Sequence, residues 1–169
     1  MKNVFSILCM VLLLASCSEK EEGEVIHLQE RNGLMFESNQ EKPFTGKYIE
    51  YSVFGQEKKR AEKNYKDGKR DGFSTLWYES GQMQSKATYK GGKQNGIETV
   101  WYMNGQKGSE GNYTDGKRNG LWTKWYTNGP KWKVINYKAG KKDGLLTVWS
   151  DDGTITKKAT YRNGSLIKG

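Results

Sequence analysis

The stretch that decides the fold is Gly68–Gly91, GKRDGFSTLWYESGQMQSKATYKG, because its pattern returns three more times at intervals of 24 residues. The later copies begin at Gly92, Gly116 and Gly140. Every copy has glycine at its first, fifth and fourteenth positions, lysine at its second, tryptophan at its tenth and tyrosine at its twenty-second. A fixed period of this size indicates stacked supersecondary units, none of which buries its apolar face alone.

Each repeat predicts one β-hairpin. Residues 73–78 alternate and are rich in β-forming residues, residues 79–82 form a turn, and residues 83–89 form a second strand. The corresponding turns Asn104-Gly105, Asn128-Gly129 and Asp152-Gly153 suit the positive φ angles of a type I′ turn. We therefore expect an all-β fold, an elongated antiparallel meander of about a dozen strands, with a helix only in the N-terminal signal segment.

Alternation along each strand predicts which side chains share a face of the sheet. Phe73, Thr75 and Trp77 fall on one side, and a smaller residue such as Ala87 stands two positions before each repeated tyrosine. We expect the repeated tryptophans and tyrosines to form one continuous apolar spine. These structural core residues are Trp77, Trp101, Trp125, Trp149, Tyr89, Tyr113, Tyr137 and Tyr161.

The N-terminus has the pattern of an export signal. Lys2 supplies a positive charge, and the apolar run Val4–Ala15 is too short to span a bilayer as a helix. The residues Leu14-Ala15-Ser16-Cys17 resemble the lipobox of bacterial lipoproteins. That resemblance implies that residues 1–16 are a lipoprotein signal peptide and that Cys17 becomes the lipid-anchored first residue. An ordinary signal peptide cleaved nearby is the alternative.

Residues 17–24 form an acidic flexible tether. The run after Cys17 is either a solvated spacer or, by its similarity to the surface-export signal of Bacteroidetes lipoproteins, a sign of surface display. The expected location is the bacterial cell envelope, as an outer-membrane lipoprotein whose surface exposure stays open. Cys9 and Cys17 are the two cysteines of the chain, so the mature domain is expected to contain no disulfide and no metal–thiolate site.

The mature chain divides into units around the repeats. We expect an N-terminal half-repeat over residues 25–43 and a C-terminal capping stub over 164–169. Five full repeats lie between them, at 44–67, 68–91, 92–115, 116–139 and 140–163.

The repeated G-K-x-x-G, W-Y-x-N-G and tyrosine pattern resembles the MORN-variant repeat. Arg31-Asn32-Gly33 followed by Pro43-Phe44-Thr45-Gly46 resembles the bacterial YwqK-type antitoxins. This resemblance covers about residues 25–169 and implies a fold built from β-hairpin repeats. Taken literally, it also implies a protein that neutralises a cognate toxin by direct binding.

The first candidate site is a row of cations near one turn of each repeat. A ladder of positive charge suits an extended polyanion, such as a phosphorylated glycan or lipid head groups. The alternative is a solvated edge whose lysines discourage pairing with other chains. Nucleic acid is an unfavoured partner for an exported protein. The candidate anion-binding residues are Lys69, Arg70, Lys93, Lys117, Arg118, Lys141 and Lys142.

The second candidate is a row of exposed aromatic side chains, Tyr78, Tyr102 and Tyr126, extended by Trp122 and Trp132. Such a row would contact sugar rings or a partner peptide. The alternative is that the row packs against the N-terminal half-repeat or is covered by lysine stems.

Nothing in the sequence indicates catalysis. His27 is the only histidine and lies near the tether, and the aspartates stand in turns where backbone geometry favours them. We expect no enzymatic activity, no cofactor and no metal site. The expected function is that of a lipid-anchored binding or scaffold protein whose partner is a protein or an anionic glycan or lipid. An antitoxin-like or immunity protein is the alternative.

Overall fold

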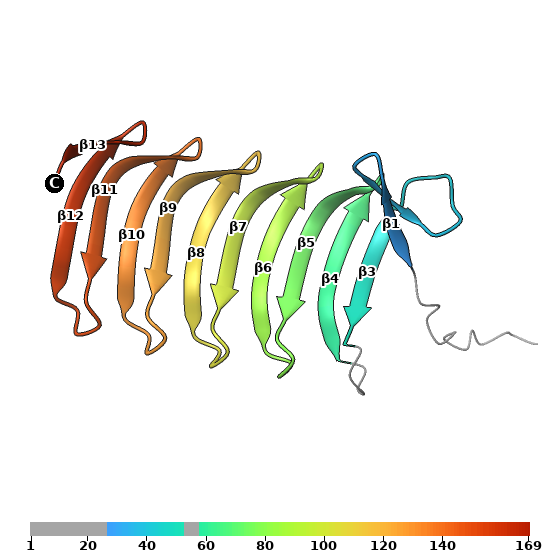
Figure 1. Ribbon diagram of the computed structural model, residues 1–169, viewed down its shortest axis with the longest axis horizontal. Helices are drawn as coiled ribbons and strands as arrows, with labels where there is room; N and C mark the ends of the chain where they lie inside the picture. The colour runs from blue at the N-terminus through green and yellow to red at the C-terminus, as the bar shows by residue number, and fades with distance from the viewer. Residues whose placement is uncertain (1–26, 53–57) are drawn as a thin grey trace, which may run out of the picture.

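The structure is a computed structural model that describes residues 27–52 and 58–169, and every regular element in that part of the chain is a strand (Figure 1). The predicted signal helix, Cys17 and the tether lie outside the described residues. The strands are β1 (Leu28–Arg31), β2 (Leu34–Glu37), β3 (Gly46–Tyr51), β4 (Lys59–Lys66), β5 (Lys69–Trp77), β6 (Met83–Lys90), β7 (Lys93–Trp101), β8 (Lys107–Thr114), β9 (Lys117–Trp125), β10 (Lys131–Lys138), β11 (Lys141–Trp149), β12 (Ile155–Arg162) and β13 (Ser165–Lys168).

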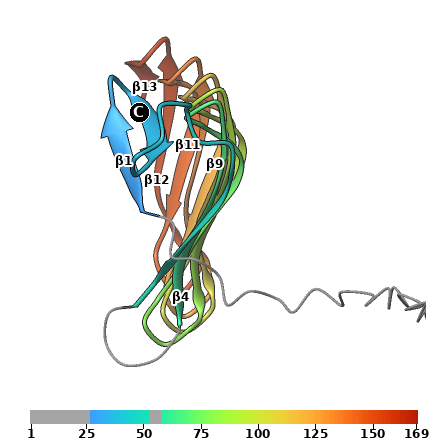
Figure 2. The same ribbon diagram turned by 90° about the vertical axis from the view of Figure 1, so that its right-hand side faces the viewer.

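The strands from β3 to β13 form one antiparallel sheet of 11 strands, ordered as they follow in the chain. Figure 2 shows that this sheet is a single bent layer. The predicted hairpin meander is therefore confirmed. β1 and β2 form a separate two-stranded sheet beside its N-terminal end. Backbone hydrogen bonds attach this hairpin and the segment after it to the first turn of the large sheet. Met35 N in β2 donates to Gly68 O at 2.9 Å, and Gly68 N donates to Phe44 O at 2.8 Å.

The type I′ turns lie at the opposite end of the hairpins from the predicted one. Asp115 and Gly116 both have positive φ, 49° and 79°, and join β8 to β9 with a two-residue loop. At the predicted site, Gly105 has a φ of 82° but Asn104 does not share it. That loop spans residues 102–106 and is closed by Tyr102 N donating to Gln106 O at 2.8 Å. The type I′ prediction for Asn104-Gly105 was wrong, because this turn type needs positive φ at both residues.

Asn104 serves its loop through its side chain instead. Its Oδ1 accepts a hydrogen bond from Gln106 N at 3.1 Å, and its Nδ2 donates to the Thr127 carbonyl of the next repeat at 2.7 Å. The asparagine thus stabilises its own loop and connects two repeats.

The register puts the repeated tryptophans and tyrosines on opposite faces of the sheet. Gly72 pairs with Tyr89 and Ser74 with Ala87, so the tyrosine shares a side with Ser74 and not with Phe73 or Trp77. The predicted single spine was therefore wrong, because a difference of one residue moves a side chain to the other face. We call the two sides the tryptophan face, with Trp77, Trp101, Trp125 and Trp149, and the tyrosine face, with Tyr65, Tyr89, Tyr113, Tyr137 and Tyr161.

The core lies on the tyrosine face and is concentrated in the C-terminal repeats. Its buried cluster consists of Trp122, Ile135, Leu146 and Ala159. Tyr113, Tyr137, Val148 and Tyr161 pack against this cluster. The four repeated tryptophans are half-buried on the other face. A sheet of one layer buries each side only through the side chains of neighbouring strands, which is why its stability depends on the stacking of repeats.

Candidate binding surface along the turn edge

The five type I′ turns of the repeats stack along one edge of the sheet, which we call the turn edge. Each turn is hydrogen-bonded to the repeat before it: Gly92 N donates to Arg70 O, and Gly140 N donates to Arg118 O, both at 2.8 Å. Carboxylates reinforce the stack, because Asp71 accepts from Gly91 N at 3.0 Å and Asp143 accepts from Asn163 N at 3.1 Å. These bonds fix the spacing of the turns at two strands, or about 10 Å.

Exposed lysines stand directly opposite one another across three of these turns. The paired residues are Lys66 with Lys69, Lys90 with Lys93, and Lys138 with Lys141. In the remaining turn between two repeats, Thr114 faces Lys117. Like charges directly opposite each other destabilise a sheet. Each pair therefore lowers the stability of the sheet. The turn does not need two lysines, since Thr114 takes the place of one of them in an equivalent turn.

The lysine stems run from one turn toward the next. A Cβ placed on Gly92 would lie 3.7 Å from Lys69 Cβ, and one placed on Gly140 would lie 3.6 Å from Lys117 Cβ. Lys93 and Lys141 have the same relation to Gly116 and Gly164, each at 3.9 Å. The glycine of each turn thus leaves room for the lysine of the preceding repeat, and the lysines form an ordered row.

The predicted cation row separates into two groups. The lysines of the first group lie on the tryptophan face: Lys69, Lys93, Lys117 and Lys141. Each is paired across its turn with the residue that directly follows a repeated tyrosine, and that residue points to the side opposite to the tyrosine. Arg70, Arg118 and Lys142 lie on the tyrosine face, over aromatic rings.

Arg118 is the best-held cation of the second group. Its guanidinium carbon lies 4.2 Å from the Trp122 ring centroid and 5.5 Å from that of Tyr137. Burial alone would lower the pKa of Arg118, but hydrogen bonds with the Tyr113 and Tyr137 hydroxyls outweigh it and raise that pKa. This cation therefore stabilises the core, and the lysines of the first group remain as the candidate anion-binding residues.

The turn edge is strongly positive. Residues 66–71, 90–95, 114–119, 138–143 and 162–167 contain 11 lysines and arginines and four aspartates. The ion pairs among the described residues are made elsewhere, by Glu50, Glu62 and Glu110 with lysines or Arg60. The exposed lysines of the turn edge are thus available to an anionic partner.

A row of exposed apolar side chains runs beside these lysines on the tryptophan face. Their exposed fractions are 55% for Phe73, 60% for Ile97, 60% for Leu121 and 52% for Leu145. All four stand at the same position of their repeats. Alternation predicted that Phe73 shares a face with Trp77, and the register agrees, because both lie on the side opposite to Tyr89.

The predicted exposed aromatic row is not exposed. Tyr78, Tyr102 and Tyr126 are half-buried. Their hydroxyls donate to the carbonyls of Trp101, Trp125 and Trp149 in the following repeats, at 2.7, 2.7 and 2.8 Å. These tyrosines connect successive repeats, and the expectation of a free aromatic surface was wrong.

The two tryptophans added to that row differ from each other. Trp122 is only 4% exposed and lies in the core, so its expected exposure was wrong. Trp132 is 38% exposed, with its ring centroid 6.1 Å from that of Tyr126.

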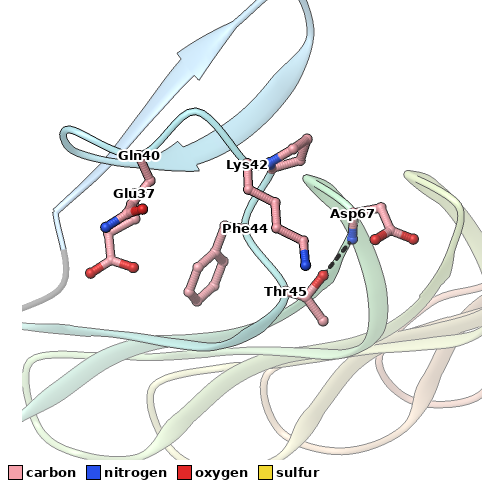
Figure 3. A pocket seen from close by; sticks show the side chains of 7 residues that line it. Glu37, Gln40, Lys42, Phe44, Thr45 and Asp67 are labelled. Atoms are coloured by element: carbon pink, nitrogen blue, oxygen red, sulfur yellow. Dashed lines mark hydrogen bonds between the residues drawn. The ribbon is translucent and has the colours of Figure 1, made fainter.

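A cavity of about 450 Å³ lies where the N-terminal hairpin meets the turn edge (Figure 3). Glu37, Lys42, Phe44 and Asp67 are among its lining residues. Thr45 Oγ1 accepts a hydrogen bond from Asp67 N at 2.8 Å and closes one side. The described residues contain no group of three His, Cys, Asp or Glu side chains that could hold a metal ion. Within residues 27–52 and 58–169 there is also no helix that is long and apolar enough to cross a membrane.

Sequence reasoning missed half of each lysine pair. Lys66, Lys90 and Lys138 each follow a repeated tyrosine directly, so a Tyr-Lys dipeptide at a fixed position was the available signal. Their importance depends on the type I′ turn, which places them opposite the predicted lysines.

Comparison with known proteins agrees with this architecture. Residues 70–90 match the sequence profile of the MORN repeat variant. The match supports a MORN-repeat protein. No curated protein matches the chain.

Among solved structures, a chain of the GtfA/B complex bound to UDP and GlcNAc aligns at 12% identity with a TM-score of 0.26. The alignment covers 81% of this chain and 24% of that one. The chain therefore spans about a quarter of the length of that protein, and the likeness carries no argument about function.

Proposed function

We propose that the protein is a non-catalytic binding or scaffold protein that holds an extended anionic partner along its turn edge. The observation that carries this proposal is the set of opposed lysine pairs on the tryptophan face. Each pair costs stability through repulsion, whereas an anionic ligand would remove that repulsion. Three such pairs, with Lys117 alone at the turn between two of them, lie along one edge and suit a polymer better than a small molecule.

The protein is anchored to the bacterial cell envelope by lipid on Cys17, as an outer-membrane lipoprotein. Support comes from the order of charge, apolar run and small residues before Cys17 in the sequence. Two lipid groups on one residue would give stable anchoring, which a single acyl chain does not. Labelling cells with a lipid precursor should tag the wild type and not Cys17→Ala. Equal labelling of both would contradict the anchor.

A protein partner is the second candidate, in the manner of an antitoxin-like or immunity protein. The apolar row favours it, because four side chains that are more than half exposed would gain from burial under another protein. The resemblance to YwqK-type antitoxins points the same way. A pull-down from envelope extracts that recovers a toxic protein, and recovers less with Leu121→Ser, would support this candidate.

Binding to immobilised polyphosphate tests the polyanion function. We expect Lys90→Gln with Lys93→Gln to weaken binding at low salt, and added salt to weaken the wild type. The matched control is Lys131→Gln with Lys157→Gln, which removes two exposed lysines away from the turn edge. Equal loss in both variants would reduce the effect to net charge and contradict a site at the turn edge.

A further inference from the structure

We propose that the anionic partner is an acidic polysaccharide that lies across the strands with one disaccharide per repeat. This inference rests on the proposed function and specifies the chemistry of its ligand. It depends on two repeated features of the tryptophan face: the spacing of its lysines, and the alternation of apolar and polar side chains beside them.

The first period is that of the lysines. One repeat contributes two strands, so neighbouring lysines of the row Lys69, Lys93, Lys117 and Lys141 are about 10 Å apart. The three opposed pairs fall on this spacing, with one pair missing where Thr114 faces Lys117. A ligand that satisfies every pair must present its negative groups at the same interval. An extended β-linked glycan with one carboxylate per disaccharide does so, because two sugar rings span about that distance. Polyphosphate and nucleic acid carry their charges more densely and would leave part of them unmatched.

The second period lies beside the first and alternates with every strand. Phe73 faces Thr88, Ile97 faces Asn112, Leu121 faces Asn136, and Leu145 faces Thr160. Each repeat therefore offers one exposed apolar side chain and one half-buried polar side chain along the same line. A disaccharide has matching features, since each ring has an apolar C–H face and its hydroxyls seek hydrogen bonds. A polyanion such as polyphosphate has no apolar group that could contact the apolar row.

The turn edge also provides space between the turns. A hollow of about 310 Å³ lies between successive turns, and its lining includes Lys93, Lys117 and Asn119. A second hollow of about 420 Å³ is lined in part by Lys66 and Lys69. The first hollow would admit a carboxylate between Lys93 and Lys117 of neighbouring repeats, although Asp115 also belongs to its lining. The second hollow has Asp67 and Asp71 beside its two lysines, which face each other across one turn, so it is the less favourable of the two for an anion.

The charge of this face argues against its burial by a second copy of the chain. Two such faces in contact would bring together their exposed lysine pairs, and like charges across an interface cost several kcal/mol. An acidic ligand makes the opposite contact. The alternating polarity then selects a glycan among acidic ligands.

The test uses the full-length protein and hyaluronan oligosaccharides in a length series, each member one disaccharide longer than the last. We expect affinity to rise with each disaccharide until the row of five turns is occupied. Neutral chitin oligosaccharides of equal ring number should not bind, since they lack the carboxylate. Thr114→Lys completes the missing lysine pair and should strengthen hyaluronan binding roughly threefold.

A second variant separates the glycan from other polyanions. Ile97→Thr with Leu121→Thr alters two side chains that are each 60% exposed, so the fold should be retained. We expect it to weaken hyaluronan binding roughly tenfold and leave polyphosphate binding unchanged. An unchanged hyaluronan affinity in this variant would overturn the glycan assignment.

The remaining outcomes distinguish the two proposals. Binding of polyphosphate, nucleic acid or acidic vesicles through Lys90 and Lys93 without hyaluronan binding would overturn the glycan and leave the polyanion function standing. Binding of none of these probes would overturn both.

Discussion

Gly111 lies directly opposite Trp122 across the junction of β8 and β9, and a Cβ on Gly111 would fall 2.1 Å from Cε2 of the indole. No real side chain tolerates such a contact, so the two residues are mutually dependent. Trp122 fills the space left by the glycine and becomes the largest member of the buried cluster. The packing of the core therefore depends on the Trp122 indole, which fits only because Gly111 has no Cβ.

Gly111→Ala should lower the free energy of unfolding by about 3 kcal/mol, because the added methyl group displaces the indole from a packed site. Denaturant unfolding measures the loss. The double variant with Trp122→Leu should lose less than the sum of the two single variants, since the smaller side chain leaves room. Additive losses would show that the two residues do not depend on each other.

Tyr102→Phe should cost about 1 kcal/mol, because it leaves the Trp125 carbonyl without its hydrogen bond from the neighbouring repeat. Thermal or denaturant unfolding checks the value. Tyr161→Phe is the matched control, since the Tyr161 hydroxyl makes no hydrogen bond to any described residue. Equal effects of the two substitutions would remove the role assigned to the hydroxyl ladder.

The sequence allowed the hairpin repeat to be predicted because glycines and aromatic residues recur at fixed positions. Alternation within one strand could not predict how the faces of two paired strands match. Gly72 bends the chain inside β5 with a φ of 100°, and the register shifts again beside Trp77. Each irregularity changes which residues stand opposite one another. Alternation along one strand correctly placed Phe73 on the face of Trp77, but it could not show that Tyr89 on the next strand lies on the other face.

The candidate site was predicted in part for a related reason. Lys69 and its equivalents can be recognised in the sequence as a repeated residue. That Lys66, Lys90 and Lys138 stand opposite them can be recognised only when the type of turn is known. The role of Tyr78 depends on a carbonyl 23 residues away in the next repeat. Such contacts depend on how neighbouring repeats stack, and the sequence of one repeat does not show this.

The protein should lose stability in acid through Glu62. Hydrogen bonds from Lys47 lower the pKa of Glu62 most, burial opposes this, and Lys59 lowers it further. A depressed folded-state pKa means that the contribution is complete above the ordinary glutamate pKa and is lost as pH falls through the folded value. In denaturant unfolding, Glu62→Gln should flatten this part of the pH profile, with a difference of less than about 1 kcal/mol. A parallel profile would exclude Glu62 as a source of the acid sensitivity.

The lysine pairs should be a measurable burden on the folded protein in the absence of ligand. Lys90→Thr reproduces the arrangement found naturally at Thr114 and Lys117, and it should raise the free energy of unfolding by about 0.5 kcal/mol at low ionic strength. The gain should fade as salt screens the charges. Thr114→Lys is the reciprocal control and should lower stability under the same conditions. Salt-independent effects, or effects of the same sign in both variants, would mean that the pairs do not repel. The proposed anionic-ligand site would then lose the stability cost on which its argument rests.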